Sequence, residues 1–339
     1  MSGTTSRSGS IGQPARVLAI VGAVSLVQVL LVLMFAWSSS RAAPHGVPIA
    51  VAGPPQATAA VAGGLDTSRP GAFDVTVLRD DAAARSAVTD RQVYASLSLS
   101  QSGATLYTAA AASPAIAQLL SQALPAAFQQ ANPGTPLTVT DLVPNPKDDP
   151  NGAGLTVSLI PIAITSIAAG VLLGLLVRDR RARLLGVLGY AVAAGLLSGL
   201  ALQTVLGVIS GSWLANAATL ALACLAISAA SAALVAALGL AGIGVAAFVI
   251  FFFGFSFSGV TSAWQLVPTP WGRIAQYLPV GATNTSLRSV AFFDGAAAGP
   301  SLLVLGVWAV LGLAVLVVVS GRARQTPTND DAPGPVLAV

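Results

Sequence analysis

Charged residues are scarce in this sequence of 339 residues, and glutamate is absent from it altogether. The charged fraction is 8%, whereas ordinary soluble domains carry about 25% charged residues. A chain with so little charge cannot cover a water-facing surface along its whole length. The net charge of +4 does not indicate nucleic-acid binding, because the arginines form no basic face with interleaved aromatic residues.

The residues that carry most enzyme chemistry are also nearly missing. The chain has one His (His45), one Cys (Cys224) and one Lys (Lys147). A single His excludes a Ser-His-Asp triad in the membrane segments, and a single Cys excludes a disulfide within the chain and disfavours a zinc site. Lys147 does not follow the glycine pattern of a phosphate-binding loop. We therefore expect no enzyme, no catalytic residue, no metal and no cofactor in this chain.

Four long stretches without any charged residue indicate where a membrane would be crossed. A helix of about 20 apolar residues spans the hydrocarbon core of a bilayer. The stretch between Arg183 and Arg273 has room for three such helices, and each of the others has room for one. The sequence thus predicts six transmembrane helices, at residues 17–37, 155–177, 184–208, 214–234, 243–262 and 302–319.

Arginines at the ends of these helices predict how they are oriented. Arg7 and Arg16 precede the first helix, and four arginines crowd into residues 178–183 between the second and the third. Because cytoplasmic loops are enriched in Lys and Arg, we expect residues 1–16 and 323–339 to be cytoplasmic tails. A cleaved signal peptide is the alternative for the first helix, but its apolar run exceeds the usual length of about 7–15 residues.

Residues 38–153 differ from the rest, because Pro, Gly, Thr, Asp and Gln separate short apolar runs. Asp80 or Asp81 can cap a helix that runs to Asp90, and Ser113 can cap another that is interrupted at Pro125. Alternating patterns and turn residues predict strands at 47–52, 73–79 and 137–143 and a hairpin of 93–99 with 104–110.

The predicted fold class is a mainly α membrane protein with six transmembrane helices. An α+β extracytoplasmic domain is inserted between the first and second helices. The whole chain is predicted to consist of a cytoplasmic tail (1–16), a first helix (17–37), the outer domain (38–153), a five-helix membrane domain (154–322) with a re-entrant outer segment (264–300), and a cytoplasmic tail (323–339).

Polar groups are few within the predicted helices. None of the spans contains Asp, Glu, Lys, Arg or His, whereas ion-coupled carriers commonly keep such a residue in the membrane to bind the coupling ion. Gln28, Gln203 and Asn216 are candidates for hydrogen bonds between helices. Glycines at both ends of 170–174 and of 195–199 have a spacing typical of close helix packing. That packing lies either within one bundle or at a dimer seam.

Two regions of the sequence resemble a known family. Residues 80–94 look like a helix leading into a strand that begins with Tyr-Ala. Residues 271–279 read Trp-Gly-Arg-Ile-Ala-Gln-Tyr-Leu-Pro and, with 284–288 and 293–295, look like an outer re-entrant hairpin. These features resemble the membrane subunits of type 2 ABC exporters, in particular the phage-infection-protein (Pip)-like branch. The residues before Arg16 depart from that pattern, since they are rich in Ser, Gly and Thr and their sequence lacks the pattern of an amphipathic interfacial helix.

The resemblance implies a permease subunit of an ATP-driven exporter, powered by a separate ATP-binding subunit and working as a homo- or heterodimer among membrane lipids. The loop after the second helix would contact the ATPase through Arg178, Asp179, Arg180, Arg181 and Arg183. An outer gate would contain Pro268, Pro270, Trp271, Arg273, Pro279, Asn284, Arg288 and Asp294.

Less specific interpretations stay open beside these roles. The arginines of 178–183 can simply orient the helices and meet lipid headgroups. Arg288 and Asp294 can form a pair, or they can be two separate solvated charges. The alternative function is a multi-pass cell-surface protein whose outer domain binds a partner, a wall component or a phage without transport. Five helices beyond a single anchor favour transport over that alternative.

Overall fold

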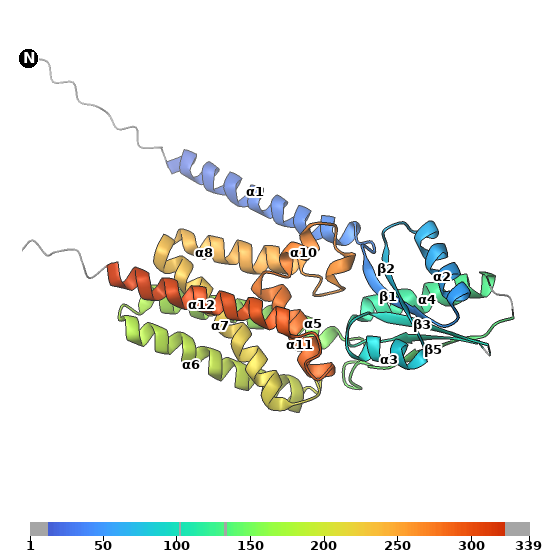
Figure 1. Cartoon of the computed structure of the whole chain (residues 1–339). Coiled ribbons are helices and arrows are strands. Elements are labelled where there is room, and N and C mark those ends of the chain that lie inside the picture. The colour runs from blue at the N-terminus through green and yellow to red at the C-terminus, as the bar shows by residue number, and fades with distance from the viewer. Residues whose placement is uncertain (1–12, 102, 132–133, 323–339) are drawn as a thin grey trace, which may run out of the picture.

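The computed structural model describes residues 13–101, 103–131 and 134–322, and the chain is mostly helical. A bundle of long apolar helices carries a small sheet domain at one of its ends (Figure 1). Among the described residues, five helices are long and apolar enough to cross a membrane. They are α1 (Gln13–Ser40), α5 (Ala153–Leu176), α6 (Arg180–Gly199) continued by the π-helical η1 (Leu200–Val205), α7 (Trp213–Leu238) and α12 (Gly299–Arg322).

The helix expected at residues 243–262 is shorter in the structure and covers Ala241–Phe257. It ends where Gly259 turns the chain with a φ of 67°. A Cβ on Gly259 would lie 2.3 Å from the carbonyl carbon of Ala263, so only glycine fits this turn. The helical segment consists of α8 (Ala241–Ala246), the π-helical η2 (Ala247–Phe253) and α9 (Gly254–Phe257).

Helix α7 forms the centre of the bundle and packs against α5, α6, α11 and α12. A Cβ on Gly170 would lie 2.3 Å from the Ser228 carbonyl oxygen, and one on Gly195 would lie 2.5 Å from the Ala221 Cβ. Gly170 and Gly195 therefore let α5 and α6 approach α7 closely. Of the two interpretations of the glycine spacing, packing within one bundle is confirmed for these helices. The Asn216 side chain donates to Gln203 Oε1 at 2.9 Å, a hydrogen bond between α7 and η1.

Helix α1 stands apart from the bundle along most of its length, and most of its apolar residues are exposed. The polar Gln28 is exposed as well, so the expected contact with another helix is wrong for this residue. It meets the bundle near its C-terminal end, where the Trp37 and Phe257 rings lie 6.3 Å apart. The start of α1, the turn between α5 and α6 and the end of α12 all lie at the end of the bundle that faces away from the sheet domain (Figure 1).

The sheet domain lies between α1 and α5 in chain order. Its strands are arranged in the order β2-β1-β3-β4-β5; β3 and β4 are antiparallel and the other neighbours are parallel. The elements are β1 (Val47–Ala52), α2 (Pro55–Ser68), β2 (Phe73–Leu78), α3 (Asp81–Thr89), β3 (Ala95–Ser100), β4 (Gly103–Thr108), α4 (Pro114–Ala131) and β5 (Leu137–Asp141).

Helices cover both faces of this sheet. Helix α3 packs Ala84 and Val88 against one face, while α4 packs Ile116 and Leu120 against the other, together with α2. The inner strand β1 is therefore buried on both sides, which explains its uninterrupted apolar sequence. The expected α+β domain therefore has three layers, with the sheet between helix α3 on one face and helices α2 and α4 on the other.

Most elements predicted for this domain are confirmed, including the hairpin and the Asp80 cap, whose carboxylate accepts from the Ala83 amide at 2.8 Å. Helix α2 was not expected. The predicted interruption at Pro125 is wrong, because α4 continues through it to Ala131. The apolar face of α4 packs on the sheet both before and after Pro125, through Leu120 and Phe128. That packing outweighs the cost of about 3 kcal/mol for a proline inside a helix.

The segment between α9 and α12 folds back into the bundle through the 3-10 turn η3 (Trp264–Leu266), α10 (Trp271–Ala275) and α11 (Pro279–Phe292). Helix α11 has Pro at its first position, as helix starts favour, and is buried against α7 and α12. The re-entrant segment therefore consists of short helices that pack against the bundle.

Candidate functional site

The sheet domain rests directly on the re-entrant segment. The amides of Ala43 and His45 donate to the carbonyls of Leu266 and Gln265 at 3.0 and 2.9 Å. Phe293 joins the apolar core beneath α3, and Leu266 joins the core on the opposite face of the sheet. We call this contact between the sheet domain and η3 to α11 the junction. It joins the domain to the segment expected to contain the gate, and we take it as the candidate functional site.

Arg288 of α11 lies at the centre of the junction and is 3% exposed. Its guanidinium donates to Asn284 Oδ1 at 3.1 Å, to the Ala111 carbonyl at 3.0 Å and to Thr156 Oγ1 at 3.2 Å. These acceptors belong to α11, the sheet domain and α5. The planar, fixed fork of an arginine suits such a three-way contact.

The expected pair of Arg288 with Asp294 is wrong, and so is the interpretation of two solvated charges. Arg288 faces inward toward the sheet domain and α5. Asp294 follows the end of α11 in a left-handed turn with a φ of 49°, and it is exposed. The turn therefore directs the carboxylate away from the buried guanidinium.

A second arginine, Arg91, reaches α11 from the sheet domain. It follows the end of α3 and donates to the Thr285 carbonyl at 2.8 Å and to the Ser289 hydroxyl. Its guanidinium also lies 5.4 Å from the centre of the Phe293 ring, within the range of a cation–π contact. The end of α3 is thereby tied to α11.

Tyr94 completes the junction by donating to Gln265 Oε1 at 3.0 Å. With Arg91, Trp264 and Thr285 it lines a cavity of about 150 Å³. Burial lowers the pKa of Arg91 and raises the pKa of Tyr94, so the site disfavours charge on both side chains.

The arginines of the junction are held without a carboxylate in contact. Within the described residues, the one ion pair at contact distance is Arg85 with Asp81, on the outer surface of α3. Carbonyl, amide and hydroxyl oxygens satisfy Arg91 and Arg288 instead. These contacts, which we call the clamp, connect α11, the start of α5 and the sheet domain.

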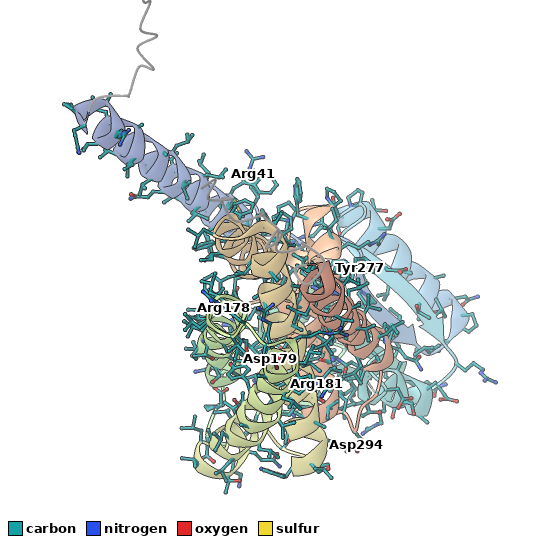
Figure 2. All side chains as sticks on the ribbon, turned by 90° about the vertical axis from the view of Figure 1, so that its left-hand side faces the viewer. Arg41, Arg178, Asp179, Arg181, Tyr277 and Asp294 are labelled. Atoms are coloured by element: carbon teal, nitrogen blue, oxygen red, sulfur yellow. The ribbon has the colours of Figure 1, made fainter. Side chains whose placement is uncertain are left out.

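The turn between α5 and α6 presents a different arrangement at the far end of the bundle. Asp179 caps α6 by accepting from the Ala182 amide at 2.8 Å, and Arg183 donates to the Val177 carbonyl. Arg178, Arg180 and Arg181 are exposed. Figure 2, which looks onto this end, shows Arg178, Asp179 and Arg181 across the bundle. Three cations are thus available to a partner or to lipid headgroups.

The other expected gate residues are spread over the re-entrant segment. Trp271 stacks on Phe257 at 5.6 Å, close to the Trp37 contact of α1. Arg273 is exposed, 6.0 Å from the ring centre of Trp264. Pro268 is buried, Pro270 precedes α10, Pro279 begins α11 and Asn284 holds Arg288.

Comparison with known protein families, curated proteins and solved structures finds no match to this chain. The resemblance to type 2 exporters therefore stays a prediction from the sequence. Functional conclusions follow from the geometry of the junction and of the arginine turn.

Several junction residues were not expected from the sequence as parts of one site. Arg91, Tyr94, Thr156 and Gln265 reach it from the sheet domain, α5 and η3. Gln265 is the one residue that the sequence marks, because it is polar and its neighbours are Trp, Leu and Val. In the structure its side chain is 4% exposed. Thr156 offered none, because a threonine at the start of an apolar helix is unremarkable.

Tyr94 gives the protein a predictable response to alkaline pH. Because burial raises its pKa above 10.0, the folded state holds the phenol proton more strongly than the unfolded chain does. This stabilisation is fully present below pH 10 and is lost as the pH rises through the raised folded-state pKa. We expect the thermal unfolding midpoint of the purified protein to fall less steeply above pH 10 in Tyr94→Phe than in the wild type. An unchanged slope in Tyr94→Phe would contradict the prediction.

Proposed function

We propose that this chain is the membrane permease subunit of an ATP-driven exporter. The sequence contains no phosphate-binding loop, so a separate ATP-binding subunit supplies the energy. Two permease subunits, identical or different, work together as a dimer in the bilayer. The proposal rests on the multi-pass bundle, on the exposed arginine turn and on the clamp at the opposite end.

The proposed topology has six spans, with both termini in the cytoplasm and residues 38–153 outside. Segment Ala241–Phe257 is the fifth span. At 1.5 Å per residue it is about 25 Å long, slightly less than the hydrocarbon thickness of about 30 Å. The arginines near Arg16, in the α5–α6 turn and at Arg322 favour this orientation, because cytoplasmic ends are enriched in positive residues.

The difference between the two ends of the bundle is the observation that carries the proposal. The exposed arginines lie at one end of α5, and Thr156 at the other end of the same helix contacts Arg288. A force applied at the turn reaches α11 and the sheet domain through a single helix. An ATPase docked on the turn can thereby move the re-entrant segment, which serves as the outer gate.

Co-purification tests the proposal directly. We expect an ATPase to be recovered with the wild-type chain in mild detergent, and its recovery to fall at least tenfold in the double variant Arg180→Ala with Arg181→Ala. Loss of two charge-assisted contacts is sufficient for an effect of this size. Arg69→Ala, on the exposed end of α2, is the matched control and should leave recovery unchanged.

The orientation of the double variant has to be checked in the same experiment, because the arginines also direct insertion. A cysteine introduced as Arg69→Cys should react with a membrane-impermeant maleimide in intact cells, with and without the two alanines. Failure of the wild-type chain to retain any ATPase would instead favour a multi-pass surface protein that does not transport.

A further inference from the structure

A crevice of about 580 Å³ opens in the sheet domain, on the side of the sheet where β1, β2 and β3 end. This volume is within the usual range of about 300–1,000 Å³ for small-molecule sites. The crevice is separate from the junction and shares no residue with the cavity at Tyr94. It is lined by Gly53, Pro54, Pro55, Arg79, Asp80, Asp81, Ser98, Leu99, Ser100 and Thr105.

The topology of the sheet explains why a crevice forms there. From β1 the chain passes through α2 to β2 on one side, and from β2 it passes through α3 to β3 on the other side of β1. Helices α2 and α3 therefore leave the strand ends toward opposite faces of the sheet. Ligands of open parallel sheets bind at such switch points, beyond the carboxyl ends of the strands.

Gly53 brings two backbone segments together at the floor of the crevice. It follows β1 with a φ of 138°, and a Cβ at this position would lie 2.6 Å from the Leu99 carbonyl oxygen. A side chain here would both strain the backbone and separate β1 from the end of β3. The glycine thus keeps the strand ends close and the crevice open.

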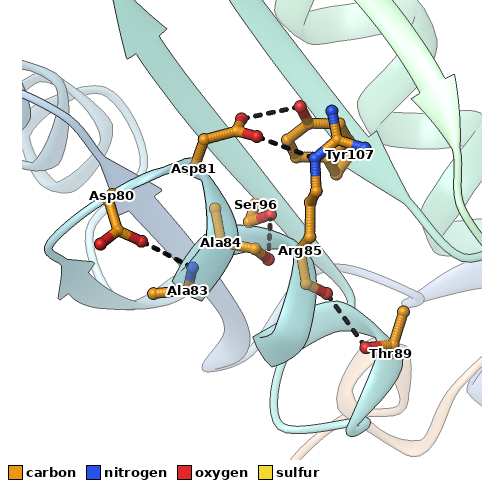
Figure 3. A network of polar contacts seen from close by, with 8 residues as sticks. All are labelled: Asp80, Asp81, Ala83, Ala84, Arg85, Thr89, Ser96 and Tyr107. Carbon is orange, nitrogen blue, oxygen red and sulfur yellow. Dashed lines mark hydrogen bonds and ion pairs between the residues drawn. The ribbon is translucent and has the colours of Figure 1, made fainter.

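Polar groups of the crevice are held in place before any ligand binds (Figure 3). Asp81 accepts from Arg85 Nε at 2.8 Å and from the Tyr107 hydroxyl at 2.7 Å, and the Arg85 guanidinium lies 4.4 Å from the centre of the Tyr107 ring. The hydrogen bond from Arg85 holds the pKa of Asp81 below its ordinary value, so this carboxylate is charged at neutral pH. Asp80 is fixed by its cap on α3.

The chemistry of the lining defines the class of ligand. The charged residues of the lining are Arg79, Asp80 and Asp81. The Asp81 carboxylate is already paired with Arg85, which lies beside the crevice, so the remaining charges of Arg79 and Asp80 balance and leave no net charge to attract an ion. Its carboxylates accept hydrogen bonds, Arg79 donates them, and the hydroxyls of the lining do both. We propose that the crevice binds a neutral, hydroxyl-rich ligand of monosaccharide or disaccharide size.

Helix α3 connects this crevice with the junction. Its first turn lines the crevice through Asp80 and Asp81, and Arg91, just beyond its last turn, contacts α11. The Ser96 hydroxyl donates to the Ala84 carbonyl at 2.8 Å and holds the helix against β3 (Figure 3). A ligand in the crevice therefore changes how strongly the backbone amides of α11 are protected from hydrogen exchange. This coupling gives the ligand a regulatory role in the proposed exporter.

The test measures binding to the full chain in detergent, without any ATPase. The probes are the common neutral hexoses, their N-acetyl amino sugars and their disaccharides at millimolar concentration, with glutamate, inorganic phosphate and spermidine as charged comparisons. We expect at least one saccharide, and none of the charged probes, to raise the unfolding temperature. Arg79→Ala should weaken that binding about tenfold, as expected for loss of a hydrogen bond to a charged group. Ser100→Trp should abolish binding by filling the crevice, while Arg69→Ala leaves it unchanged.

Hydrogen exchange of α11 provides the second readout. The bound saccharide should slow amide exchange in α11 of the wild type, and Arg91→Ala should retain binding but lose this effect. Absence of binding by every saccharide, or binding that Ser100→Trp does not remove, overturns the proposed site. Binding with unchanged exchange in α11 overturns the relay. Neither result depends on whether the chain exports, because no ATPase is present.

Discussion

Replacement of Arg288 by alanine is expected to lower the free energy of unfolding by about 3 to 5 kcal/mol. The guanidinium is buried, and its removal leaves the Ala111 carbonyl and the Asn284 amide oxygen without their donor. Buried acceptors without partners are costly because no water replaces the lost hydrogen bond. Denaturant unfolding of the purified chain measures the change. Faster proteolysis of the segment between β5 and α5, near Asn151, would report separation of the sheet domain.

Arg273→Ala is the matched control for this prediction. Arg273 belongs to the same re-entrant segment, but it is exposed, and its loss should change stability by less than about 1 kcal/mol. Arg288→Lys keeps the charge without the planar fork and should fall between the two. Equal stability of Arg288→Ala and Arg273→Ala would show that the clamp does not hold the domain.

Replacement of Gly170 by leucine is expected to destabilise the bundle by at least about 3 kcal/mol and to reduce the yield of folded protein sharply. A Cβ at this position already meets the Ser228 carbonyl oxygen at 2.3 Å and the Ser231 Cβ at 2.8 Å. The first of these atoms is backbone, so α5 and α7 must separate to make room. Size-exclusion profiles and thermal unfolding of the detergent-purified variant measure the effect.

Gly189→Leu on α6 is the control, because nothing lies within 4 Å of a Cβ at that position. It adds the same apolar volume to an exposed helix surface and should leave the yield near that of the wild type. If Gly170→Leu is tolerated equally well, the close approach of α5 and α7 is not needed for folding.

Local sequence patterns were sufficient for much of the fold. Runs without charge located the long helices, since the composition of about 20 neighbouring residues decides whether a segment can enter a membrane. The Asp80 cap and the hairpin depend on residues close together in the chain, and both were predicted. Helix α2 was missed because its Ala- and Gly-rich sequence carries a weak pattern, and the continuity of α4 through Pro125 depends on packing against the sheet.

The arginine turn, the junction and the crevice differ in how far the sequence predicts them. The arginine turn was identified from the sequence by itself, because its six residues are contiguous and its charge is local. The junction was not, since Arg288 contacts Ala111 and Thr156 across 177 and 132 residues of chain. The saccharide crevice likewise depends on three strands meeting at one edge. Hydropathy and charge patterns thus determined which segments are apolar and where the turn lies. Only the tertiary structure decided which polar groups are buried together, because burial of a charge requires partners from elements far apart in the chain.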